Sequence, residues 1–228
     1  MNKKILALLF CVTMNCGAAV KILLTAALSD LHFDFRKQQY LESFAAFNNY
    51  GIGPADLYIV ESLKKQGPTF LEEYSDHVYY THVNNPHLRN QGINEAKAVL
   101  DAVTHFNFEP DDMVIKLTGR HKFATDYFLQ KVHANLGYDA IVKIVYNGNM
   151  VSAAFAMKVK YLIELSNSLD YNRMEHNFVN LEEAMGNYIL TKHHQGALNV
   201  LFIDKLDMHA QIYGSTTAPG CSPELIIW

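Results

Sequence analysis

The feature that most constrains this fold is a regular alternation of short apolar runs with longer segments of helical periodicity. Apolar runs of strand length lie at 21–29, 56–62, 76–82, 111–117 and 138–146, with later ones at 197–203 and 209–214. Segments whose apolar residues recur at helical spacing lie at 35–51, 92–106, 125–137, 154–169 and 180–193. Alternating strands and helices predict an α/β fold, with a mostly parallel sheet covered by helices.

The length and composition indicate a single domain without a linker. The chain has 228 residues, 50% of them hydrophobic, which is enough to bury one substantial core. A formal net charge of −4 and a pI near 6.2 argue against general nucleic-acid binding, because phosphate neutralisation requires a clustered basic surface. Any anionic ligand must therefore be held by a local group of residues.

The amino-terminal segment has the order of a secretory signal peptide. Basic residues come first, an apolar stretch follows from Ile5, and small residues precede a cleavage point after Ala19. We therefore expect a signal peptide at 1–19, a mature domain at 20–228, and a location in the secretory pathway, the periplasm or outside the cell. The alternative is an amino-terminal strand or a short membrane anchor, although the apolar stretch is short for a membrane span and contains Asn15.

Polar residues end the fourth predicted strand. Lys116 interrupts its apolar run, and Thr118, Gly119 and Arg120 then supply a hydroxyl, a permissive backbone and a guanidinium. A lysine at the end of a central strand is costly unless its ammonium reaches solvent, a carboxylate or a bound anion. The pattern indicates an anion site, and the alternative is a solvated strand end with Arg120 paired to one of the aspartates at 111–112.

Other strand ends supply polar residues that would meet at the same edge of the sheet. In open α/β sheets, ligands bind outside the carboxyl ends of the strands, where helix amino termini attract anions. Thr25 lies near the end of the first strand with Arg36 soon after, and Glu61 ends the second strand. The segment RNQGINEA at 89–96 combines turn residues with a helix start, so it could hold a sugar or a phosphate, or simply cap the helix.

The order of these segments resembles a known family. The chain carries an arginine-bearing loop and QQYLESF after the first strand, followed by IVES, NQGINEA and DDMVIKLTGR. With these segments in this order it resembles, over 21–213, small glycosyltransferase-like proteins of the nucleotide-diphosphosugar-transferase (GT-A) fold. The resemblance implies one Rossmann-like domain with a nucleotide-sugar site and a carboxyl-terminal acceptor region. It also implies that Lys116 and Arg120 neutralise the donor diphosphate. The donor-binding residues expected on this basis are Thr25, Arg36, Glu61, Asn90, Gly92, Asn94, Glu95, Lys116, Thr118, Gly119 and Arg120.

The resemblance is incomplete at the metal site. Metal-dependent enzymes of this fold usually carry an Asp-x-Asp motif, which holds Mg²⁺ or Mn²⁺, at the end of the strand that here ends in KLTGR. Cations stand there instead, so we expect no metal or other cofactor, with Lys116 and Arg120 stabilising the leaving group. A divalent ion held by carboxylates elsewhere, such as Glu61 or Asp207, remains open, as does a purely structural role for Lys116.

Transfer of a sugar to a hydroxyl also needs a general base. Glu182 is the candidate, and the alternative is an ordinary solvated glutamate. Glu183 lies three residues after Asn180, a spacing typical of a helix cap. Asp207 and His209 are weaker candidates.

These expectations define a function and a rival. We expect an enzyme that transfers a sugar from a nucleotide-sugar donor to a hydroxyl of a glycan or other acceptor. Its partners would be these two substrates, with no nucleic acid and no stable membrane span. The alternative is a non-catalytic secreted protein that binds a nucleotide or a glycan on the same scaffold. A P-loop, a glycine-rich dinucleotide motif and a GxSxG motif are all missing from the sequence, which weakens NTPase, dehydrogenase and hydrolase assignments.

Overall fold

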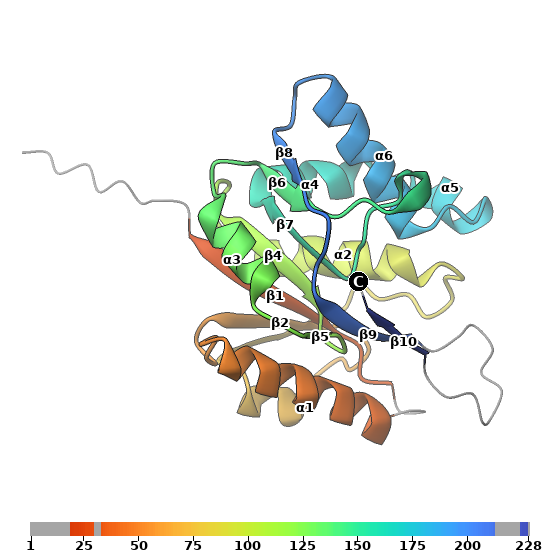
Figure 1. The fold of residues 1–228 in the computed structure, drawn as a ribbon. Helices are drawn as coiled ribbons and strands as arrows, with labels where there is room; N and C mark the ends of the chain where they lie inside the picture. Colours follow the sequence, from red (N-terminus) through yellow and green to blue (C-terminus); the bar gives the residue numbers. More distant parts are fainter. Residues whose placement is uncertain (1–18, 30–32, 213–223, 228) are drawn as a thin grey trace, which may run out of the picture.

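The main element of the protein is a seven-stranded sheet with the strand order β3-β2-β1-β4-β7-β6-β8 (Figure 1). The computed structural model describes residues 19–29, 33–212 and 224–227. The first four strands in this order run parallel, β7 is antiparallel to both β4 and β6, and β6 is parallel to β8. The strands are β1 (Val20–Ala26), β2 (Leu57–Glu61), β3 (His77–Tyr80), β4 (Met113–Thr118), β6 (Ala140–Val142), β7 (Ala154–Lys158) and β8 (Val200–Phe202). The predicted α/β fold with a mostly parallel sheet is confirmed.

Helices cover both faces of this sheet. Alternate residues of β1 point to opposite faces, so Leu24 joins one buried cluster and Leu23 the other. The first cluster is closed by α1 (Phe33–Asn49) and α3 (Tyr127–Ala134), and the second by α2 (Gln91–His105), α4 (Val159–Ser168), α5 (Tyr171–His176) and α6 (Leu181–His194). Two short 3-10 turns, η2 (Phe70–Glu73) and η3 (Tyr146–Gly148), lie in the connections.

A small second sheet lies beside the carboxyl end of β4. It is antiparallel and has the order β10-β9-β5, from β10 (Glu224–Ile227), β9 (Met208–Ile212) and β5 (Lys122–Phe123). The carboxyl-terminal part of the chain therefore returns to the residues that follow β4. This pairing places the late strands next to the strand end that the sequence singled out.

The segment 154–169 was expected to be one helix, and the structure corrects this prediction. Its first part, Ala154–Lys158, is strand β7, and only Val159–Ser168 is helical. Ala154 to Met157 are fully buried because β7 pairs with β4 on one side and β6 on the other. The alternation of small and large apolar residues fits either structure, and the two neighbouring strands decide it by taking the backbone hydrogen bonds.

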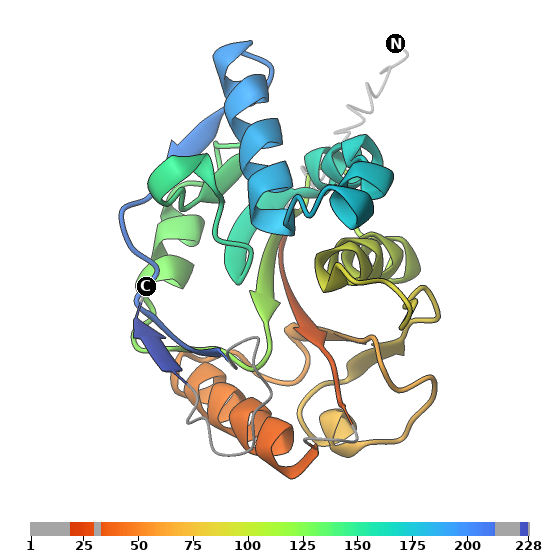
Figure 2. The same ribbon diagram turned by 90° about the vertical axis from the view of Figure 1, so that its right-hand side faces the viewer.

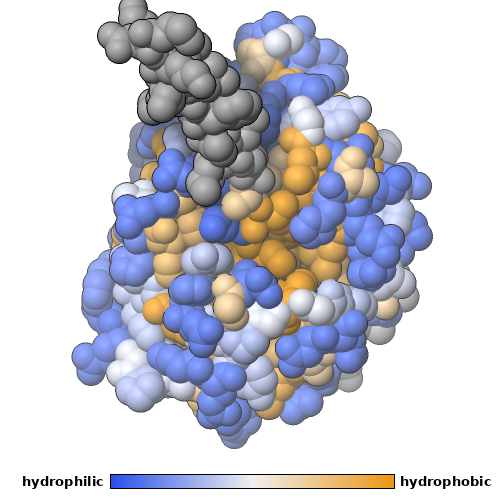
Figure 3. All heavy atoms as spheres, turned by 90° about the vertical axis from the view of Figure 1, so that its left-hand side faces the viewer, coloured by the Kyte–Doolittle hydropathy of each residue, from blue (hydrophilic) through white to orange (hydrophobic). Residues whose placement is uncertain are grey.

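The two ends of the sheet differ in character. Figure 2 views the molecule towards the carboxyl ends of β1 and β4, where the connecting loops gather. Figure 3 shows the opposite side, on which hydrophobic residues collect in the middle of the face within a hydrophilic surround. No helix among the described residues is long and apolar enough to cross a membrane.

Candidate active-site cleft

A cleft with two adjoining lobes lies at the carboxyl ends of the central strands. The first lobe, about 370 Å³, reaches from the end of β1 and from α1 to the start of α2. The second lobe, about 400 Å³, extends over the loop 145–149 and the residues before β7. The residues that line both lobes are Glu95, Thr118, Arg120, Asn180 and Glu182. A ligand in one lobe would therefore meet a ligand in the other at these shared residues.

Most of the predicted site residues converge on this cleft. The members of the predicted donor set that line the first lobe are Thr25, Arg36, Asn90, Gly92, Asn94, Glu95, Thr118 and Arg120. Glu182, the predicted base, lines both lobes. Glu61, Lys116 and Gly119 line neither lobe, and each has a structural reason.

Arg120 is the cation best placed for an anionic ligand. Its guanidinium makes no hydrogen bond or ion pair with any residue that the structure describes. The alternative pairing with the aspartates before β4 does not occur: Asp111 pairs with Lys160 at 2.8 Å, and Asp112 accepts from the backbone N–H of Ala19 and Glu109. The charge of Arg120 is therefore available to both lobes.

Lys116 is held inside the protein, which corrects the predicted direct contact with a diphosphate. The side chain is 1% exposed. Its ammonium pairs with Glu95 and donates to Thr118 Oγ1 and the Ser152 carbonyl, each at 2.8 Å. These acceptors use the three N–H donors of the ammonium, so none remains for a ligand. The open alternative of a structural role fits this geometry.

Glu95 is the acidic member of this pair and faces the cleft. Burial alone would raise the pKa of its carboxyl, but the charge and hydrogen bond of Lys116, together with Arg120 and Thr118, outweigh burial and hold the pKa below its usual value. Glu95 is therefore ionised at neutral pH and balances Lys116. The sequence indicated two cations at this strand end. Glu95 balances Lys116, so Arg120 is the one whose positive charge is uncompensated.

Glu61 is a loop anchor, contrary to its predicted place in the donor site. It is fully buried, and its carboxylate accepts hydrogen bonds from the backbone N–H groups of Leu28, Leu63 and Lys64 at 2.7–3.1 Å. Burial raises the pKa of this carboxyl, and the backbone donors partly offset the rise. Glu61 thus ties the loop after β1 to the loop after β2, and it shapes the first lobe without touching it.

Gly119 serves close packing, where an approach to a ligand was expected. A Cβ atom at this position would collide with the side chains of Leu24 and Tyr40. Tyr40 is itself fixed, because its hydroxyl accepts from the backbone N–H of Ala27 at 2.8 Å. The glycine allows β4 to turn tightly under α1, and this turn places Arg120 in the cleft.

The segment 90–95 acts mainly as a helix start. Asn90 is the N-cap of α2, accepts from the Gly92 backbone N–H at 3.0 Å, and donates to the carbonyls of Met174 and Val179. Asn94 is buried and exchanges hydrogen bonds with the backbone of Asn85. The capping alternative is confirmed, and these amides border the first lobe with their polar atoms already used within the protein.

Two helix amino termini border the cleft. The helix α2 contributes Gln91 and Gly92, and α6 contributes Leu181 and Glu182. They approach closely, because a Cβ at Gly92 would lie 2.7 Å from Leu181 Cβ. The side chains of Asn90 and Asn180 take one N–H group in each of these first turns. The partial positive charge of the two helix termini remains, and together with Arg120 it favours an anion in the first lobe.

Glu182 is placed to act on a ligand at the junction of the lobes. Asn180 caps α6 by accepting from the Glu183 backbone N–H at 2.7 Å, which confirms the predicted helix start. Glu182 Oε1 accepts a hydrogen bond from Ser152 Oγ at 2.6 Å. Its Oε2 makes no hydrogen bond to a described residue, so one carboxylate oxygen is oriented and the other can meet a ligand.

The weaker candidates lie elsewhere. Asp207 pairs with Lys205 at 2.9 Å and accepts from Thr125, and His209 lies on β9. Within the described ranges, no group of three or more histidine, cysteine, aspartate or glutamate residues could hold a metal ion. The alternative metal site with Glu61 finds no support, because Glu61 uses its carboxylate on backbone N–H groups.

His121 was missed by the sequence analysis although it directly follows Arg120. It is buried and lines the second lobe. Burial, and then the nearby charges of Arg120, Lys116 and Arg36, lower the pKa of its imidazole to about 3. A histidine beside a predicted anion site was a usable signal, but its burial depended on the packing of α1.

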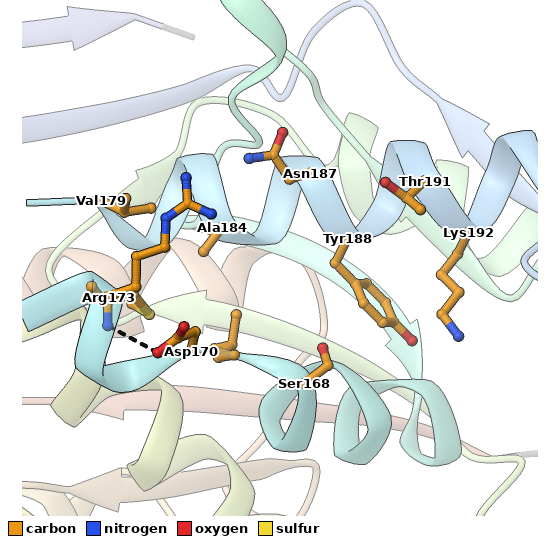
Figure 4. A pocket seen from close by; sticks show the side chains of 11 residues that line it. Ser168, Asp170, Arg173, Val179, Ala184, Asn187, Tyr188, Thr191 and Lys192 are labelled. Carbon is orange, nitrogen blue, oxygen red and sulfur yellow. Dashed lines mark hydrogen bonds between the residues drawn. The ribbon is translucent and has the colours of Figure 1, made fainter. Parts of the chain in front are cut away.

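A further cavity of about 310 Å³ lies away from this cleft, between the end of α4, α5 and α6 (Figure 4). Arg173, Asn187 and Tyr188 line it, and Asp170 accepts from the Arg173 backbone N–H at 2.9 Å. None of the predicted site residues lines this cavity.

Comparisons with known proteins give structural likeness only. No family model matches the sequence, and no curated protein matches it. A candidate nucleotide-diphospho-sugar transferase from Desulfovibrio desulfuricans G20 has a TM-score of 0.49 at 10% identity, covering 82% of this chain and 80% of that chain. A glycosyltransferase involved in glycosylation of the major capsid of PBCV-1 has a TM-score of 0.46 at 8% identity, covering 82% of each chain.

A third solved structure, a 4-diphosphocytidyl-2C-methyl-D-erythritol synthase, has a TM-score of 0.47 at 9% identity, covering 82% of this chain and 89% of that chain. With TM-scores below 0.5, these three likenesses carry no conclusion about family or activity, so the function has to be derived from the cleft.

Proposed function

We propose that this chain is a glycosyltransferase-like enzyme, which transfers a sugar from a nucleotide-sugar donor to a hydroxyl group of an acceptor. The observation that carries the proposal is the position of Arg120. Its guanidinium has no partner among the described residues, and Arg120 and Glu182 both line both lobes. A cation and a carboxylate where two pockets meet suit a reaction that separates a diphosphate from a sugar.

In this proposal the nucleotide diphosphate lies in the first lobe. Arg120 and the first turns of α2 and α6 would attract its phosphates. The guanidinium can donate parallel hydrogen bonds to two phosphate oxygens, so it would also stabilise the charge that develops on the leaving group. Thr25 and Arg36 border the rest of this lobe.

The acceptor would enter through the second lobe and meet Glu182. The free Oε2 takes the proton from the acceptor hydroxyl, while Ser152 holds Oε1. The acceptor oxygen then forms a bond to the anomeric carbon, the bond from that carbon to the diphosphate oxygen breaks, and its electron pair leaves with the diphosphate. Arg120 faces the negative charge that develops on the departing diphosphate. The two substrates are the only molecules that the reaction consumes.

Two further properties belong to the proposal. Positive charge from Arg120 and from the helix termini supports donor binding without a divalent ion. Residues 20–228 would form the mature, secreted protein; the predicted signal peptide lies almost wholly outside the described residues. Mass spectrometry of the protein from its native compartment checks the processing, and recovery of the intact Met1 terminus would contradict it.

The test is calorimetric titration of the mature chain with UDP and GDP, first in EDTA and then in Mn²⁺. One of these nucleotides should bind with similar affinity in both. The Arg120→Ala variant should bind it about tenfold to a hundredfold more weakly, because a charge-assisted contact contributes about 1.5–3 kcal/mol. The control, Arg173→Ala, removes an arginine that lines the separate cavity and should bind normally.

A second arm addresses catalysis. Glu182→Gln should retain nucleotide affinity but lose about 10²–10⁴-fold in transfer rate, as expected when a general base is removed. Binding of neither nucleotide by the unaltered chain would overturn the proposal and favour the glycan-binding alternative. Binding seen only with Mn²⁺ would show that a metal, and not the Arg120 charge, holds the diphosphate.

A further inference from the structure

The second lobe contains a buried polar side chain that the proposed reaction does not use. His121 is 6% exposed, and its Nδ1 atom is buried without a hydrogen-bond partner among the described residues. Leaving a buried nitrogen unpaired costs about 1–3 kcal/mol, and buried polar atoms in native proteins are seldom left in this state. Nδ1 itself has almost no exposed surface, but His121 lines the second lobe and its Nε2 atom also makes no hydrogen bond to a described residue, so a bound molecule can supply a partner to the imidazole through Nε2.

The backbone of His121 is fixed by hydrogen bonds at both its N–H and its carbonyl group. The N–H of His121 donates to the Thr118 carbonyl at 3.0 Å, and the His121 carbonyl accepts from Ser43 Oγ in α1. The charged groups that act on the ring are Arg120, Lys116 and Arg36, all positive, and with burial they keep the imidazole neutral. A neutral imidazole offers one acceptor nitrogen and one donor nitrogen, which matches a hydroxyl group.

An exposed aromatic side chain lies on a loop whose two ends line the same lobe. Val145 and Asn149, the ends of a tight loop, line the lobe and are joined by a 2.8 Å backbone hydrogen bond. Tyr146, between them, is 94% exposed. An aromatic face can pack against the apolar C–H face of a sugar ring, while the hydroxyls of that ring reach polar groups.

We infer that His121 is a specificity-determining residue of the second lobe, which hydrogen-bonds a hydroxyl of a sugar ring that packs on Tyr146. The inference rests on the proposed function, since it identifies the acceptor as a carbohydrate. Ser152 and Glu182 then face another hydroxyl of the same ring, the one that reacts. A flat aromatic ligand would use only the contact with Tyr146, and a simple alcohol would use only a hydrogen bond.

The experiment titrates the full mature chain with the methyl glycosides of glucose, galactose, mannose and N-acetylglucosamine. The imidazole nitrogen resonances of His121 are followed by NMR and assigned by their loss in His121→Phe. At least one glycoside should shift the His121 signals. His121→Phe, which keeps an aromatic ring but removes both nitrogens, should weaken that glycoside about tenfold or more, whereas His121→Asn should stay within about threefold.

Matched variants test the aromatic contact. Tyr146→Ala should weaken the same glycoside and Tyr146→Phe should not, while Phe202→Ala removes a partly exposed aromatic on β8, outside the cleft, and should have no effect. The inference is overturned if no glycoside shifts His121, or if folded His121→Phe binds with unchanged affinity.

UDP and GDP binding, measured on the same samples, separates the two proposals. Nucleotide binding without a sugar response refutes the role of His121 and leaves the proposed function standing. A sugar response at His121 without nucleotide binding refutes the transferase and leaves a glycan-binding protein.

Discussion

At the scale of single residues, the buried pair of Lys116 and Glu95 has the most direct energetic consequence. Removing one member of such a pair leaves an uncompensated charge, which typically costs about 3–5 kcal/mol. We therefore expect Lys116→Met to lower the free energy of unfolding by about 3 kcal/mol, at the lower end because Glu95 is partly open to the cleft. Urea denaturation at neutral pH measures it, with Lys160→Met, from the exposed pair with Asp111, as a control that should change little. A Lys116→Met variant as stable as the native chain would show that Lys116 has no structural role. The predicted role of Lys116 in anion binding would then stand again.

At the scale of elements, the contact between α6 and the loop 145–149 controls the shape of the second lobe. A Cβ at Gly186 would collide with the Gly148 carbonyl and lie 3.1 Å from the Met150 backbone nitrogen. Gly186→Ala should therefore force the helix and the loop apart and destabilise the protein by about 1–3 kcal/mol, the usual cost of overpacking. Gly137→Ala is the matched control, because nothing lies within 4 Å of a Cβ there. Chemical denaturation compares the two, and equal stability of both variants would mean that this contact yields without cost.

At the scale of the whole molecule, His121 makes stability depend on pH. Its folded-state pKa, about 3, lies below the ordinary value of 6.5, so the unfolded chain binds the proton more readily. The stability that this depression contributes is present above pH 6.5 and is lost as the pH falls from there towards 3. Between about pH 7.5 and about pH 5 we expect a loss of up to about 2 kcal/mol from this residue. Denaturation curves of the native chain and of His121→Phe measure it, and parallel pH profiles for the two would contradict the prediction.

Much of the fold followed from local patterns in the chain. The apolar runs and helical periodicities predicted β1 to β4 and the helices α1, α2, α3 and α6, because the spacing of apolar residues records which side of each element is buried. The same approach failed at 154–169, where a short apolar stretch suits a strand or a helix equally. Only the neighbouring strands β4 and β6, brought in from distant parts of the chain, made it β7.

The site divides in the same way. The sequence by itself determined which polar residues follow the strands, and parallel pairing brings Thr25, Thr118 and Arg120 to one edge of the sheet, since the carboxyl ends of parallel strands must meet there. Only the tertiary structure decided which cation is available. Lys116 and Arg120 look alike in sequence, but three acceptors, two of them from distant segments, enclose the lysine, and none reaches the arginine among the described residues. Burial and hydrogen-bond partners are properties of packed surfaces, and they are set when distant segments meet.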